Sequence, residues 1–120
     1  MENSKVYTIL LVLNKWKRRS LEKFVQSAYL NSQEEVAVLY KILNDCVETF
    51  PTKETIYKKI HPKQTYNDQQ LRLYMSYLFK TIEKFLIFEQ IEEDPFLQKV
   101  KLMDAYNNLS QNKNFYKIYE

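Results

Sequence analysis

The sequence predicts an all-α fold, a bundle or array of about six helices packed around one long central helix. Apolar residues recur at spacings of three and four over most of the chain. No segment alternates apolar and polar residues with the period of two that strands show. The 120 residues include no glycine, so the usual hairpin turns of a β fold are missing as well.

The first two helices are expected on either side of a basic run. Residues 4–14 are apolar almost all round, which is typical of a short buried helix, and Lys15 to Arg19 would neutralise its C-terminal carbonyls. An amphipathic helix then begins at the N-cap Ser20 and runs to about Leu30. Without glycine, asparagines are expected to close helix ends, and they stand where closures are needed: Asn14, Asn31, Asn107 and Asn108.

A capping box that begins at Ser32 predicts the third helix, which continues to Phe50. Pro51 ends it, because proline cannot continue the hydrogen-bond ladder. Thr52 caps a short fourth helix over residues 52–60, which stops before His61-Pro62.

A second capping box at Asn67 opens the longest helix, predicted over residues 67–90, whose apolar stripe marks it as the central element. Asp94 as N-cap and Pro95 as the first helical residue predict a sixth helix. A further apolar pattern starts at Asn114. We therefore expect a single all-helical domain over residues 1–120, as the N-terminal part of a longer helical protein.

Several packing and turn patterns resemble the N-terminal region of a group of uncharacterised bacterial all-helical proteins. They are Ser27-x-Tyr29-x-Asn31, Ile56-Tyr57 with His61-Pro62, and Tyr66 through Leu71-Arg72-x-x-Met75-Ser76-x-Leu78 with Phe85-Leu86. The resemblance covers roughly residues 20–120 and implies further helices in the parent protein. The group has no assigned activity, so it implies no functional residues.

Composition limits the location and the chemistry. The single cysteine, Cys46, cannot form an intramolecular disulfide, which favours the cytoplasm. The apolar run Val6 to Leu13 is far shorter than the roughly 20 residues that span a bilayer, so no membrane association is expected. Because glycine is absent, phosphate-binding loops, dinucleotide turns and nucleophile elbows are excluded.

No enzymatic activity, cofactor or metal is expected. One histidine and one cysteine, separated by a proline break, do not make a metal site. We interpret Cys46 as a buried thiol on the third helix and His61 as a helix-end residue. The acidic pairs Glu34-Glu35 and Glu92-Glu93 stand at helix starts, where acids are favoured in any case.

A helical protein-interaction or scaffolding module is the favoured function. Ten tyrosines and seven phenylalanines exceed what a core of this size needs, and exposed aromatic side chains are good interface residues. The partner would be another protein or further helices of the same chain. The candidate interface residues lie near the C-terminus: Tyr106, Phe115, Tyr116, Ile118 and Tyr119.

The alternative is a helix-turn-helix-like DNA-binding domain formed by the helices 52–60 and 67–90. Its candidate base contacts are Gln69, Gln70 and Arg72, and its candidate phosphate contacts are Lys15, Lys17, Arg18 and Arg19. The connector is about twice the length usual for the motif, and Asp68 would face phosphates. A formal charge of +3 is compatible with DNA binding but is too small to indicate it, so nucleic acid is not the favoured partner.

Overall fold

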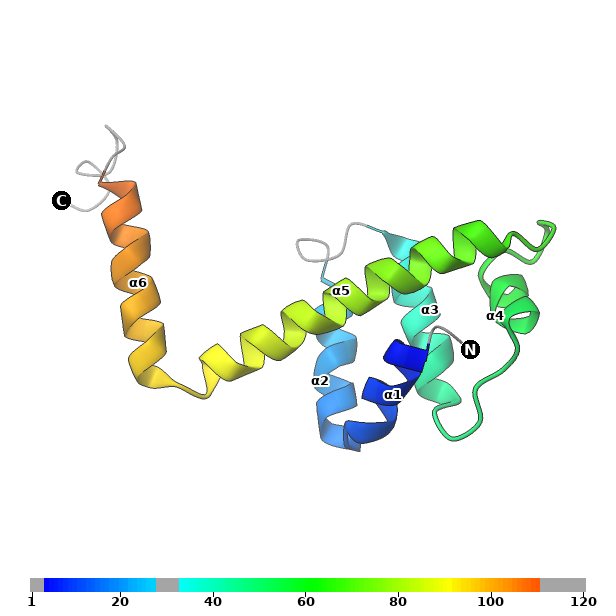
Figure 1. Ribbon diagram of the computed structural model, residues 1–120, viewed down its shortest axis with the longest axis horizontal. Helices are drawn as coiled ribbons and strands as arrows, with labels where there is room; N and C mark the ends of the chain where they lie inside the picture. Colours follow the sequence, from blue (N-terminus) through cyan, green and yellow to red (C-terminus); the bar gives the residue numbers. More distant parts are fainter. Residues whose placement is uncertain (1–3, 28–32, 111–120) are drawn as a thin grey trace. The chain divides into compact units, whose positions relative to one another are not determined.

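A computed structural model describes residues 4–27 and 33–110, and these residues confirm the all-helical class (Figure 1). None of them lies in a strand, and they form six helices. The helices are α1 (Ser4–Val12), α2 (Lys15–Val25), α3 (Glu34–Asp45), α4 (Lys53–Ile60), α5 (Asp68–Glu92) and α6 (Pro95–Leu109). The chain forms two compact units, Met1–Phe85 and Leu86–Glu120.

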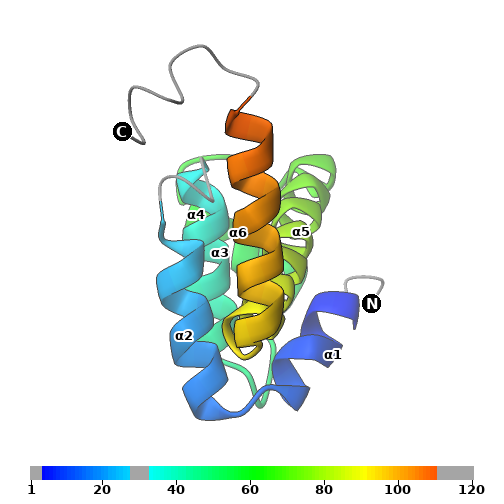
Figure 2. The ribbon, with the colours of Figure 1, turned by 90° about the vertical axis from the view of Figure 1, so that its left-hand side faces the viewer.

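The first unit holds the apolar core, and the first part of α5 lies across its four shorter helices (Figure 1). Figure 2 shows α2 and α3 side by side, and α3 also contacts α4. Each helix of this unit supplies fully buried side chains, among them Leu10, Leu21, Leu39, Leu43, Ile56, Leu78 and Ile82. Burying one such side chain stabilises the fold by about 1.5–3 kcal/mol. The 25-residue α5 buries seven of its side chains, more than any other described helix, which confirms it as the long central helix.

Side-chain caps start α4 and α5 where the sequence predicts them. The Thr52 side chain accepts a hydrogen bond from the Thr55 backbone N–H at 3.3 Å. Asn67 Oδ1 accepts one from the Gln70 backbone N–H at 3.0 Å. Each bond satisfies a backbone donor that the first turn of a helix leaves open.

The boundary between α1 and α2 differs from the prediction. The basic run Lys15 to Arg19 forms the first turns of α2 and does not follow a longer first helix. The reason is Asn14, whose Oδ1 accepts a hydrogen bond from the Lys17 backbone N–H at 2.8 Å and so caps α2. Ser20 therefore lies inside α2 and is not its N-cap, and Leu30 lies outside the described residues.

The limits of α3 differ as well. Its N-cap is Gln33, whose side chain makes no capping hydrogen bond, while Ser32 lies outside the described residues. The helix ends at Asp45 and does not reach Phe50. Cys46 is therefore the half-buried C-cap of α3 and not a buried residue on its apolar stripe.

The helix ends that the structure describes close without a left-handed residue. None of the described residues has a positive φ, and the C-caps Gln26 and Ser110 lie in the right-handed helical region. The predicted asparagine closures are wrong for Asn14, the cap of α2, and for Asn107 and Asn108, which lie within α6. Asn31 lies outside the described residues.

The second unit contains the end of α5 and α6. The predicted start of α6 is confirmed, because Asp94 Oδ1 accepts a hydrogen bond from the Leu97 backbone N–H at 3.0 Å and Pro95 follows as the first helical residue. Within the described part of the chain, α6 buries none of its side chains. No helix among the described residues is both long and apolar enough to cross a lipid bilayer.

Candidate functional site

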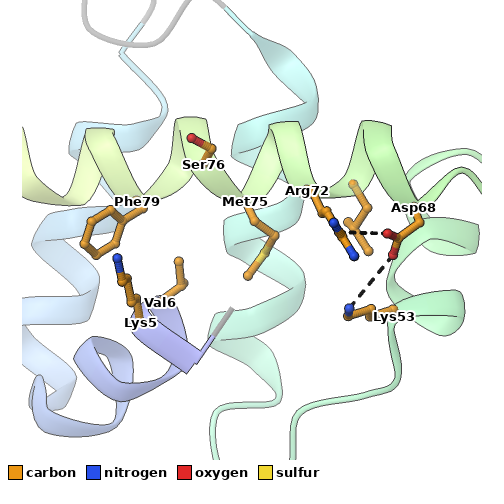
Figure 3. A pocket seen from close by; sticks show the side chains of 9 residues that line it. Lys5, Val6, Lys53, Asp68, Arg72, Met75, Ser76 and Phe79 are labelled. Atoms are coloured by element: carbon orange, nitrogen blue, oxygen red, sulfur yellow. Dashed lines mark ion pairs between the residues drawn. The ribbon is translucent and has the colours of Figure 1, made fainter. Parts of the chain in front are cut away.

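A pocket of about 280 Å³ lies in the first unit between α1, the start of α4 and the first part of α5 (Figure 3). We call it the α1–α5 pocket. Its apolar walls are Val6, Leu71, Met75 and Phe79. Its polar rim is made of Lys5, Lys53, Asp68, Arg72 and Ser76. Residues from distant parts of the sequence thus meet at one concave site with apolar walls and a charged rim.

Asp68 is the anionic member of the rim, and neighbouring side chains surround its carboxylate. Tyr66 donates a hydrogen bond to Oδ1 at 2.6 Å, Arg72 Nε lies 2.8 Å from Oδ2, and Lys53 Nζ lies 3.9 Å from Oδ1. The Tyr66 hydrogen bond, helped by the Arg72 and Lys53 charges, holds the pKa of Asp68 below its usual 3.8. The same hydrogen bond raises the pKa of Tyr66 to about 12. Asp68 is therefore ionised at neutral pH, and its carboxylate already contacts Tyr66, Arg72 and Lys53.

The cationic members of the rim outnumber the anionic one. Lys5 Nζ lies 5.8 Å from the centre of the Phe79 ring, and within the described residues Lys5 makes no ion pair. Arg72 pairs with Asp68 through Nε, and its side chain is 68% exposed. Its two terminal nitrogens make no hydrogen bond in the described part of the chain. In Figure 3 these two cations stand at opposite ends of the pocket, with Met75 between them. The rim thus offers positive charge and open hydrogen-bond donors.

A polar and aromatic cluster joins α4 to α5 beside the pocket. The buried Tyr57 hydroxyl lies 3.1 Å from Gln64 Oε1 and 2.5 Å from Gln70 Oε1. His61, the C-cap of α4, places Nε2 2.8 Å from the Tyr74 hydroxyl, and burial raises the pKa of Tyr74. These contacts fix the connector between the two helices, so the cluster has a structural role.

The three residues considered for reading DNA bases are mostly engaged within the protein. Gln70 contacts Tyr57, and Arg72 pairs with Asp68, while Gln69 is exposed. The connector between α4 and α5 comprises residues 61–67, longer than the three or four residues usual for a helix-turn-helix. This arrangement does not favour base recognition.

Arg18, in the basic run, links helices of the first unit. Its Nε donates a hydrogen bond to Asn44 Oδ1 at 3.1 Å, and Nη1 donates to the Leu13 carbonyl at 3.0 Å. The Tyr40 hydroxyl donates to the Arg18 carbonyl at 2.7 Å, and burial raises the pKa of Tyr40. Arg18 therefore connects the end of α1 to α3, and its guanidinium is half-buried rather than presented to a ligand.

The other basic residues of this run lie on the surface of α2. Arg19 stacks over the exposed Trp16 ring at 5.4 Å, Lys15 is exposed and Lys17 is half-buried. Figure 1 shows the first turn of α2 well away from the first turn of α5, where Gln69 lies. The structure does not bring the two sets of candidate nucleic-acid contacts together.

Of the candidate protein-interface residues, Tyr106 is 42% exposed on α6. The other four, Phe115, Tyr116, Ile118 and Tyr119, lie outside the described residues. Tyr106 shares one face of α6 with Phe96, Val100 and Met103, because these positions are separated by four, three and three residues. All four side chains are exposed, and we call them the α6 surface.

Sequence reasoning missed the α1–α5 pocket. Lys5 and Phe79 are far apart in the sequence, and Val6 and Met75 read as ordinary core residues. The one local signal was Asp68 four residues before Arg72, a spacing that pairs opposite charges on a helix. Among the described residues, no group of three or more His, Cys, Asp and Glu side chains is placed to hold a metal ion.

No family model, curated protein or solved structure matches this chain. The residues and their surroundings therefore carry the functional argument.

Proposed function

We propose that this chain is a non-enzymatic protein-interaction or scaffolding module that binds through the α6 surface. One observation carries the proposal: α6 exposes Phe96, Val100, Met103 and Tyr106 and buries none of its side chains in the described part of the chain. The buried apolar side chains of the described residues all belong to the first unit, although that unit also exposes Leu11, Val12 and Trp16. The single Cys46 fits a reducing cytoplasm, where we place the module.

The physical reason is the cost of leaving these side chains in water. Phe96 is 76% and Met103 70% exposed, and covering side chains of this size is favourable by about 1.5–3 kcal/mol each before the cost of association. Aromatic residues and methionine are also enriched at interfaces. Leu102 and Leu109 add apolar area elsewhere on the same helix. A helix with apolar side chains on several sides is typical of one packed between neighbours.

The partner that we propose is a second copy of the chain. Two α6 surfaces related by a twofold axis would cover the same side chains on both copies. The charged side chains of α6 have mixed signs, Lys99 and Lys101 against Asp104, so little repulsion opposes the pairing. One face of a single helix makes a small contact, and small interfaces are typical of weak, reversible dimers.

Sedimentation velocity from low to high micromolar concentration tests the proposal. We expect the wild-type chain to shift reversibly from monomer to dimer. Met103→Glu should abolish the shift, because it places a charge in the apolar contact. Asn108→Glu adds the same charge outside the α6 surface and should preserve the shift. A wild-type chain that stays monomeric throughout, or equal effects of both substitutions, would overturn the proposal.

A further inference from the structure

We propose that the α1–α5 pocket is a binding site for a small anionic amphiphile, a molecule with one acidic head group and a short apolar chain. This inference concerns the first unit and is independent of the α6 surface. It goes beyond protein interaction, because it assigns a small ligand to the chain.

The pocket walls suit an apolar chain. Val6, Leu71 and Met75 are at most 6% exposed, so the deep part of the site is lined by core side chains. The volume of about 280 Å³ is close to the lower end of the roughly 300–1,000 Å³ that small-molecule pockets occupy in proteins. The site therefore suits a ligand with a short apolar chain.

The rim selects an acidic head group. Arg72 presents two terminal nitrogens in the planar geometry that binds carboxylates, and Lys5 adds a second cation at the other end of the site. Asp68 does not oppose an anion strongly, because Arg72 Nε, Lys53 and the Tyr66 hydroxyl already surround its carboxylate. The rim keeps a positive excess, since it carries three cations, Lys5, Lys53 and Arg72, and one carboxylate, Asp68.

Two methionines make the site directly observable. Met75 lines the pocket, whereas Met103 lies on the α6 surface and is not part of it. The experiment is an NMR titration of the full chain, labelled with ¹³C at the methionine methyl groups, with octanoate below its micelle concentration. We expect a saturable shift of the Met75 methyl signal and little change at Met103. A shift at Met103 that matches the one at Met75 would show unspecific binding and overturn the proposal.

Ligand controls test the head group. Octanol has the same chain without a charge, and octylammonium carries the opposite charge. We expect octanoate to bind best, octanol about threefold more weakly because a surface ion pair is lost, and octylammonium weakest. Octanol or octylammonium binding as tightly as octanoate would contradict the role of the rim. Binding of an acidic peptide at Met75 without binding of octanoate would overturn the small-ligand assignment.

Matched variants test the cations. Lys5→Gln leaves the Asp68 contacts intact and should weaken octanoate binding about threefold, and Arg72→Gln should do at least the same. Lys84→Gln removes a charge from α5 outside the pocket and should leave the affinity unchanged. The thermal midpoint of each variant verifies that it is folded. If Lys5→Gln and Arg72→Gln both leave the affinity as Lys84→Gln does, the pocket rim does not recognise the anion.

Discussion

Arg72 binds Asp68 from one turn further along α5, with Nε 2.8 Å from Oδ2. The same carboxylate accepts the Tyr66 hydroxyl at 2.6 Å, so it ties the connector before α5 to the first turn of the helix. This pair places Arg72 at the rim of the α1–α5 pocket and engages part of the guanidinium that the sequence suggested for a DNA base.

Acidification should destabilise the first unit through Asp68. Because its pKa in the folded chain is lowered from 3.8, its stabilising contribution is present above pH 3.8 and is lost as the pH falls through the folded-state pKa. Urea unfolding monitored by circular dichroism gives the free energy of unfolding at each pH. Asp68→Asn should reduce the pH dependence of this free energy below pH 3.8. An unchanged pH dependence would contradict the stabilising role of the Asp68 carboxylate.

Leucines of the two units should differ sharply in their contribution to stability. Leu78→Ala removes a side chain with 0% exposure and should cost about 2–5 kcal/mol of unfolding free energy. Leu102→Ala truncates a side chain on α6 that is 52% exposed and should change it by no more than about 0.5 kcal/mol. Urea unfolding of dilute samples measures both values. Similar costs would mean that Leu102 is buried in the isolated chain.

Tyr57→Phe should lower the free energy of unfolding by about 0.5–1.5 kcal/mol, because it removes a buried hydroxyl that contacts Gln64 and Gln70. Tyr77→Phe is a suitable control on α5, since its side chain is only half-buried. Urea unfolding of both variants gives the comparison. Equal effects would show that the cluster between α4 and α5 adds no specific stability.

We expect no sequence-specific DNA binding. Fluorescence anisotropy with duplex DNA should show at most weak binding at low salt. This binding should disappear at moderate salt, because contacts to phosphates weaken as the salt concentration rises. Gln69→Ala should not change the affinity for DNA. A preferred DNA site whose affinity depends on Gln69 and Arg72 would restore the helix-turn-helix alternative.

The sequence predicted the later helices better than the earlier ones. Thr52, Asn67 and Asp94 cap helices through bonds to residues three positions ahead, so their role can be recognised locally. The prediction for Asn14 was wrong, because asparagine is common both at helix ends and at helix starts. The neighbouring basic run favoured the end of the first helix, whereas Asn14 caps the start of α2.

The candidate sites also differ in how much of them the local sequence reveals. The apolar spacing on α6 could be seen in the sequence, but its exposure could not, since a stripe of this kind usually faces a core. The α1–α5 pocket depends on how α1 packs near Phe79 and on how the α4–α5 connector positions Asp68. Contacts between residues so distant in sequence leave no local pattern.

Cysteine cross-linking at Met103 tests most directly whether α6 is the contact surface. In a Cys46→Ser background, Met103→Cys and Lys101→Cys place single thiols on opposite faces of the helix. A short bismaleimide should join two copies efficiently through position 103 and poorly through position 101. Equal yields at both positions, or no cross-linked dimer at position 103, would contradict an interaction module that uses the α6 surface.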